Sequence, residues 1–219
     1  MGNYVVILDM NGMEVIAKSL NLNTLDMLRY PYECPVGYKP SRDANLRGHL
    51  VPIDGALSHV EGLALYSLIR AIGAKRIVEL GTFAGHSTNY LAAAARETGG
   101  IVDTVDNVWY WGGVIRGQAI TLSNRRVVRQ HKSDAYKYLL NKCEDNLVDF
   151  IFEDTSHTWR DTYRIIALAC RKLRSGGILA IHDVAVCREV REAVEYSGLN
   201  FLSIAAWPSE FGLALWRKP

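Results

Sequence analysis

Residues 76–88, which read RIVELGTFAGHST, encode a strand, a glycine-containing turn and the start of a helix. Ile77 and Val78 are β-branched residues of the kind that favour a buried strand. Gly81 and Gly85 follow, and glycine lets the backbone turn tightly and approach a ligand without an intervening side chain. The helix that comes next has free amides in its first turn, and these can bind an anion. We therefore expect a ligand-binding turn at the carboxyl end of this strand.

Strand and helix patterns alternate along most of the chain. This alternation is typical of a mostly parallel sheet with helices on both faces. The last two strand patterns are joined by only four residues, too few for a crossover helix, so these strands should pair antiparallel. The predicted fold class is α/β and Rossmann-like, with a seven-stranded, mostly parallel sheet and a C-terminal antiparallel hairpin. The expected strands cover 76–80, 101–106, 127–131, 148–152, 177–181, 201–207 and 212–216.

The bulk composition is that of an ordinary globular protein. Hydrophobic residues make up 49% of the chain and charged residues 22%, which argues against disorder. The formal net charge of +2 is too small to indicate a nucleic acid or a membrane surface as partner. The four cysteines form no CxxC pair, which favours reduced thiols over a disulfide framework. We expect a soluble, cytoplasmic protein with no signal peptide and no membrane span.

The spacing of the turn favours S-adenosylmethionine over a dinucleotide. Dinucleotide sites read Gly-x-Gly-x-x-Gly, but here Glu79 stands at the first glycine. Its negative charge would oppose a pyrophosphate and suit a sulfonium. Asp106 ends the next strand, where an acidic side chain can accept ribose hydroxyls, although a nicotinamide enzyme stays an alternative. The residues expected to bind the cofactor are Glu79, Gly81, Thr82, Phe83, Gly85, Ser87, Asp106, Asn107, Ser133, Asp134 and Asp154.

Acidic and histidine side chains follow the fourth and fifth core strands. Because neighbouring parallel strands end at the same edge of a sheet, Asp154 and His157 should meet His182 and Asp183. Two carboxylates and an imidazole can hold a divalent cation such as Mg²⁺, which would lower the pKa of a substrate hydroxyl. A neutral histidine could instead act as general base. We predict all four as catalytic residues, with Asp154, His182 and Asp183 as metal ligands.

Simpler roles are also open for these side chains. Aspartate and histidine at strand ends often cap the next helix or bond to loop backbone, and Asp161 needs no other role. Ser133-Asp134 would lie beside an adenine ring, or would only form the N-cap of the following helix.

Three stretches resemble a known family. Residues 77–88 are similar to the first motif of the catechol O-methyltransferase-like class I enzymes, and residues 148–159 and 173–183 resemble their bacterial branch, which includes the macrocin O-methyltransferases. The resemblance implies S-adenosylmethionine as cofactor and Mg²⁺ held by Asp154 and the His182-Asp183 pair. Two positions depart from the family. Ser156 replaces a second acid and His182 stands where an acid is usual, which leaves a metal-free, histidine-assisted mechanism open.

These patterns predict two parts of the chain. A methyltransferase domain covers residues 55–219, and an extension over residues 1–54 covers the substrate or serves as a homodimer contact. Asn11-Gly12 separates apolar runs at 4–10 and 13–19, the pattern of a β-hairpin. The expected reaction methylates a hydroxyl of a small molecule. The alternatives are a catalytically silent S-adenosylmethionine-binding subunit or regulator, and a methyltransferase for a nucleic acid or another nucleophile.

Overall fold

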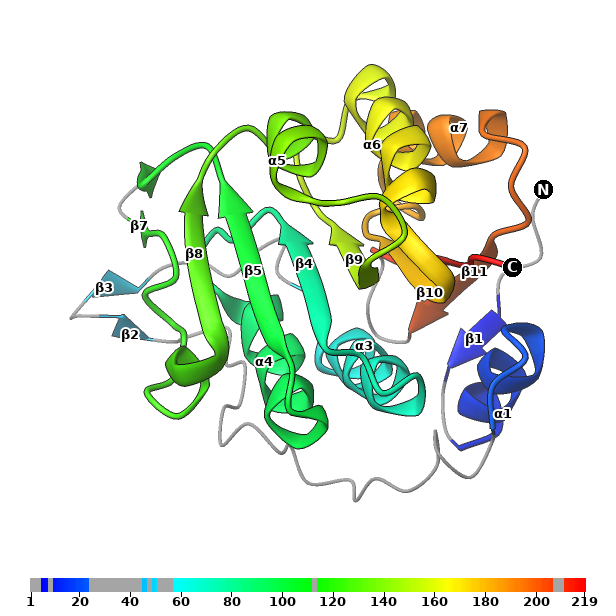
Figure 1. The fold of residues 1–219 in the computed structure, drawn as a ribbon, viewed down its shortest axis with the longest axis horizontal. Coiled ribbons are helices and arrows are strands. Elements are labelled where there is room, and N and C mark those ends of the chain that lie inside the picture. Colours follow the sequence, from blue (N-terminus) through cyan, green and yellow to red (C-terminus); the bar gives the residue numbers. More distant parts are fainter. Residues whose placement is uncertain are drawn as a thin grey trace.

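The described part of the chain folds around one large sheet. The computed structural model describes residues 5–7, 10–23, 45–46, 49–50, 57–111, 114–206 and 211–219. Within these ranges, an eight-stranded sheet lies between two layers of helices (Figure 1). One layer contains α3 (His59–Ala71) and α4 (His86–Thr98), and the other contains α5 (Ala135–Lys142), α6 (Trp159–Lys172) and α7 (Arg188–Tyr196).

The sheet confirms the predicted mostly parallel topology and its antiparallel end. The strand order is β1-β11-β12-β10-β9-β4-β5-β8, and only β12 runs antiparallel to its neighbours. The seven predicted strands are present, and β1 adds an eighth that pairs parallel with β11. The strands are β1 (Val5–Ile7), β4 (Arg76–Leu80), β5 (Ile101–Asp106), β8 (Val128–Lys132), β9 (Val148–Glu153), β10 (Leu173–Ile181), β11 (Leu202–Ala206) and β12 (Leu213–Arg217).

Smaller elements lie outside this sheet. Two short antiparallel pairs are formed by β2 (Asn45–Leu46) with β3 (His49–Leu50) and by β6 (Tyr110–Trp111) with β7 (Val114–Ile115). A 3-10 helix, η1 (Asn124–Val127), precedes β8. No helix in the part of the chain that the structure describes is long and apolar enough to cross a membrane.

The strand order reverses beside β4, and this reversal locates the ligand site. β4 pairs with β5 on one side and with β9 on the other. In open α/β sheets the loops at such a switch point separate and leave a crevice at the carboxyl ends of the strands. Asp154, directly after β9, donates its backbone N–H to the carbonyl oxygen of Leu80 at 2.9 Å, so the two strand ends stay in register.

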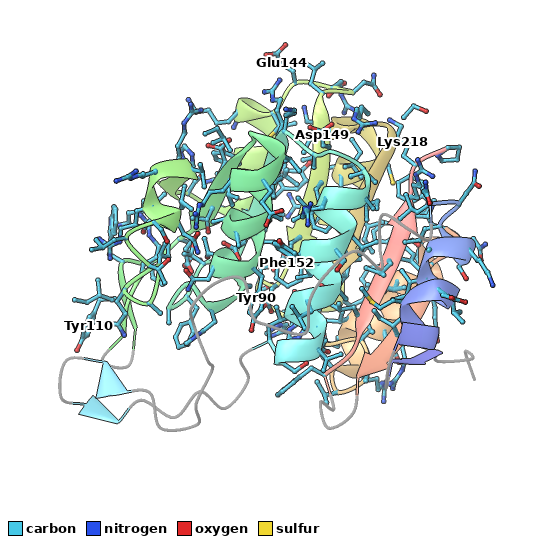
Figure 2. All side chains as sticks on the ribbon, turned by 90° about the horizontal axis from the view of Figure 1, so that it is seen from below. Tyr90, Tyr110, Glu144, Asp149, Phe152 and Lys218 are labelled. Atoms are coloured by element: carbon cyan, nitrogen blue, oxygen red, sulfur yellow. The ribbon has the colours of Figure 1, made fainter. Side chains whose placement is uncertain are left out.

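Two apolar layers hold the helices against the sheet. Successive side chains of a strand point to opposite faces, and in β9 Phe150 and Phe152 join the core under α3 and α4 while Ile151 joins the other. Figure 2, which labels Tyr90 and Phe152, shows the first of these layers from the α3 and α4 side. Each such buried aromatic or aliphatic side chain contributes about 1.5–3 kcal/mol to folding. The sheet is therefore a rigid base for the loops at its edge.

The hairpin predicted over residues 4–19 does not form. Its first run contains β1, but the second run is the helix α1 (Met10–Ser19). Ile16, Ala17 and Leu20 are buried in the same core as α3, and their spacing of one and four residues places them on one face of a helix. Burial of this face outweighs the turn preference of Asn-Gly. Residues 1–4, 8–9, 24–44, 47–48 and 51–54 of the predicted extension lie outside the described residues.

Candidate active site

The turn after β4 needs a glycine because the chain after β9 crosses it. Gly81 has φ +97°, and a Cβ added there would overlap the carbonyl oxygen of Asp154. Its N–H bonds to the carbonyl oxygen of Val105 at 2.8 Å. Gly85 has φ +93°, and a Cβ there would lie 2.5 Å from Ile120. The glycines thus bring the three loops after β4, β5 and β9 together.

Asp106 fastens the glycine turn to the end of β5. Its Oδ2 accepts the backbone N–H of Thr82 at 3.2 Å and of Phe83 at 2.9 Å, and its Oδ1 accepts that of Val108 at 3.1 Å. A carboxylate has about four acceptor positions. Three of these positions accept backbone N–H groups of the turn and the loop after β5, so about one position is left to accept a ligand hydroxyl.

Glu79 is enclosed behind the turn. Its side chain has no solvent exposure and accepts hydrogen bonds from the hydroxyls of Ser87 and Thr88, both at 2.6 Å. Burial raises the pKa of Glu79 to about 7. The carboxyl group joins the end of β4 to the first turn of α4, and it does not line the cavity described next.

A cavity of about 590 Å³ opens at the carboxyl ends of β4, β5, β8 and β9. This volume suits a ligand of the size of a nucleoside-containing cofactor. Glu79 and Gly85 are the predicted cofactor residues that do not reach it. Asp134 reaches it and also caps α5, since it accepts the backbone N–H of Lys137 at 2.9 Å. The predicted cofactor residues that line it are Gly81, Thr82, Phe83, Ser87, Asp106, Asn107, Ser133, Asp134 and Asp154.

The four predicted catalytic residues come together at one side of this cavity. His157 Nε2 lies 2.7 Å from Asp183 Oδ2 and 3.4 Å from Asp154 Oδ1. His182 Nδ1 lies 3.4 Å from Asp154 Oδ1 and 3.4 Å from Asp183 Oδ1. Asp154 and His157 line the cavity, whereas His182 and Asp183 are buried directly behind them.

The charges of this cluster decide which of its groups carry protons. Hydrogen bonds to Asp154 and Asp183 raise the pKa of His157 to about 10, so at neutral pH its imidazole is a cation. Burial alone would raise the pKa of Asp154, but the nearby His182 and His157 lower it overall. Because its pKa is raised, His157 is a proton donor in this state and not a ready base.

His157 and Asp183 both adopt left-handed backbone, with φ 56° and 63°. This conformation costs energy in residues other than glycine.

Asp154, His182 and Asp183 fit a divalent cation. One donor atom from each lies within 4.8 Å of the others. The His182 side chain has no exposure, and neither of its nitrogens makes a hydrogen bond of good geometry within the described residues. One nitrogen and two carboxylate oxygens are donors that suit Mg²⁺ or Mn²⁺. Ser156, at the family's second acid, lies apart from these donors and donates to Asp161 Oδ2 at 3.0 Å.

Known proteins are similar to this chain in sequence and in fold. A family model described as a methyltransferase domain matches residues 78–184, which include the turn, Asp106 and the His182-Asp183 pair. The chain is thus similar to methyltransferases over these residues. Its sequence is 27% identical over 143 residues to "Probable caffeoyl-CoA O-methyltransferase 2" of Dictyostelium discoideum. That match covers 64% of this chain and 59% of the relative, so the chain spans less than two thirds of its length.

Solved methyltransferase structures share the fold over nearly the whole chain. The O-methyltransferase TomG of Streptomyces achromogenes, solved with S-adenosylmethionine, matches with a TM-score of 0.62 at 19% identity. That match covers 97% of this chain and 100% of TomG. An O-methyltransferase of Bacillus cereus, solved with S-adenosylhomocysteine, gives 0.59 at 18% identity, covering 96% and 100%.

Two buried charged residues near the site were not singled out from the sequence. Arg116 donates to the carbonyl oxygens of Asp106 at 3.1 Å and His131 at 2.7 Å, with its guanidinium 3.6 Å from the centre of the Trp109 ring. No sequence pattern marks it. Glu61 lies 3.6 Å from His182. Its only sequence signal is the serine three residues before it, a capping-box pattern that marks a helix start.

Proposed function

We propose that this chain transfers the methyl group of S-adenosylmethionine to a hydroxyl of a small molecule. The observation that carries the proposal is that one continuous cavity is lined by the glycine turn and Asp106 and also by Asp154 and His157. A cofactor bound along the turn would thus end beside groups that can act on a substrate oxygen. The names of the Dictyostelium and Streptomyces relatives support the same chemistry.

The cofactor would bind along the floor of the cavity. Its ribose would reach Asp106, and its adenine would lie by Ser133 and Asp134, which line the same cavity. The methionine carboxylate would face Ser87 and the free amides of the first turn of α4, where the helix dipole favours an anion. Leu57, near the start of the domain over 55–219, also lines the cavity. The extension over residues 1–54 would cover the substrate from the same end of the domain.

Asp154, His182 and Asp183 would hold Mg²⁺ or a similar divalent cation. When bound, the metal would supply positive charge that lowers the pKa of a coordinated hydroxyl, and the hydroxyl proton would pass to solvent. Hydrogen bonds to Asp154 and Asp183 raise the pKa of His157, which favours its protonated form. It would therefore donate a hydrogen bond to the substrate oxygen and stabilise its negative charge. Much of the rate gain would come from alignment of that oxygen with the methyl group and sulfur.

We also propose the compartment, the class of substrate and the assembly of the protein. Cys143, Cys170 and Cys187 are unpaired in the described residues, which supports a reducing compartment such as the cytoplasm. The net charge of +2 supports a small molecule over a nucleic acid as substrate. Assembly as a homodimer remains part of the same proposal.

Titration calorimetry with S-adenosylmethionine and S-adenosylhomocysteine, with and without Mg²⁺, tests the cofactor site. A methyl-transfer assay against a panel of hydroxylated small molecules tests the reaction. Binding with turnover supports the proposal, and binding without turnover on any panel member favours the silent subunit. Absence of binding to either ligand refutes the cofactor assignment.

A further inference from the structure

Glu61 faces His182 from the side opposite to the two aspartates. Glu61 Oε2 lies 3.6 Å from Nε2 of His182, while Asp154 and Asp183 face Nδ1. The side chains of Glu61 and His182 both have no solvent exposure. The imidazole therefore lies between one carboxylate on its Nε2 side and two on its Nδ1 side.

Helix capping does not explain why Glu61 is so deeply buried. Its Oε2 accepts the N–H of Ser58 at 3.0 Å and the hydroxyl of Ser58 at 2.7 Å, which completes the capping box of α3. A capping glutamate can do this at the protein surface. Here its Oε1 also accepts the N–H of Gly212 at 2.8 Å. Glu61 thus connects α3 with the segment before β12 and lies beside the end of β10.

These contacts bear on which nitrogen of His182 carries a proton when the imidazole is neutral. A neutral imidazole has one N–H and one lone pair. If the N–H is on Nε2, facing Glu61, the lone pair of Nδ1 faces carboxylate oxygens of Asp154 and Asp183, both 3.4 Å away. Three electron-rich atoms in this arrangement repel one another unless a proton or a cation lies among them. Neighbouring ligands about 2.1 Å from one metal are about 3 Å apart, close to the separations found here.

Two aromatic rings lie near the buried imidazole. The ring of Phe152 lies 6.1 Å from that of His182 between centroids, and the ring of Phe211 lies 5.6 Å away. The imidazole is thus in partly apolar surroundings, where an unpaired polar group is costly.

We propose that Glu61 is a positioning residue that receives the Nε2–H of His182 and so presents Nδ1 as ligand to a divalent cation shared with Asp154 and Asp183. This inference rests on the metal site in the proposed function. Histidines that bind metals commonly donate their other N–H to a carboxylate, and loss of that partner weakens metal binding by roughly 10- to 100-fold. Glu61 would then determine metal affinity without touching metal or substrate.

Calorimetric titration of the full chain with Mn²⁺ tests this role. Glu61→Gln keeps the size of the side chain but replaces one carboxylate oxygen with an N–H donor, so Mn²⁺ affinity should fall by roughly 10- to 100-fold. The matched control is Glu144→Gln, the same substitution at an exposed glutamate in the loop before β9. It should leave Mn²⁺ affinity unchanged. In a His182→Ala background, Glu61→Gln should cause no further loss.

Three results would overturn the inference: wild-type affinity in Glu61→Gln, an equal loss in Glu144→Gln, or no Mn²⁺ binding by the wild-type chain. Should Glu61→Gln unfold at the assay temperature, Glu61→Asp, which withdraws the carboxylate by one methylene, should weaken Mn²⁺ binding in the same direction. Titration of each preparation with S-adenosylhomocysteine separates the two proposals. If S-adenosylhomocysteine still binds, the cofactor assignment holds even when the Mn²⁺ titrations contradict the role of Glu61.

Discussion

Replacing Glu79 by glutamine should make the stability of the fold less dependent on pH. Glu79 is fully enclosed, and burial raises its pKa to about 7 from an ordinary value of 4.5. Between these two pH values the folded state holds a proton that the unfolded state has released. The free energy of unfolding must therefore decrease as pH rises from about 4.5 to about 7, because the folded state binds more protons.

The size of this effect follows from the two pKa values. At about 1.4 kcal/mol for each pH unit, ionising Glu79 in the folded state costs about 3 kcal/mol at pH 8. Glutamine fits the same space, and the hydroxyls of Ser87 and Thr88 can rotate to donate to its oxygen and accept from its nitrogen. Glu79→Gln should match the wild type at pH 5 and exceed its free energy of unfolding by up to about 3 kcal/mol at pH 8.

Urea unfolding at half-unit steps from pH 5 to pH 8 measures this difference. Burial also raises the pKa of Glu153 to about 7, so the variant keeps part of the wild-type slope, and the difference between the two curves isolates Glu79. The exposed Glu144 provides the control, Glu144→Gln, which should leave the slope unchanged. Parallel curves for the wild type and Glu79→Gln would show that the carboxyl group at position 79 is not held protonated by burial.

Three further substitutions test the site. Gly81→Ala would place a Cβ against the carbonyl oxygen of Asp154, at a residue with positive φ. It should lower the free energy of unfolding by on the order of 2 kcal/mol and weaken S-adenosylhomocysteine binding. An unchanged urea midpoint would contradict this. Asp106→Asn should lower S-adenosylhomocysteine affinity by roughly 10-fold and melting temperature by a few degrees, because hydrogen bonds to a charged group are lost; full affinity in calorimetry would remove Asp106 from the ribose site. His157→Ala should lower turnover roughly 100-fold with little change in cofactor affinity, and a wild-type rate would place the chemistry elsewhere.

Local sequence patterns predicted most of the sheet and the residues at its edge. The strand-turn-helix pattern around Gly81 has a purely local cause, since the glycines, the β-branched strand and the helix start lie within thirteen residues. The convergence of Asp154 and His157 with His182 and Asp183 also followed, because parallel neighbours end at the same edge. These predictions needed only periodicity and strand adjacency.

Other features depended on contacts that no local pattern encodes. Asn11-Gly12 favours a turn, but the burial of Ile16 and Ala17 against α3 selected a helix instead. Glu79 matched a cofactor motif, yet its carboxyl group bonds inward to Ser87 and Thr88. The role proposed here for Glu61 arises because α3 passes beside the end of β10, more than a hundred residues later in the chain.

The addition of β1 also affects how the sheet avoids self-association. An outermost strand has unpaired N–H and C=O groups that can recruit another chain, and natural proteins limit this with short or charged strands. At one end the outermost strand is β1, only three residues long, and it pairs with the five residues of β11. At the other end β8 exposes Arg129 and Lys132. Among the described residues, one border of the sheet is thus a short strand and the other border carries positively charged side chains.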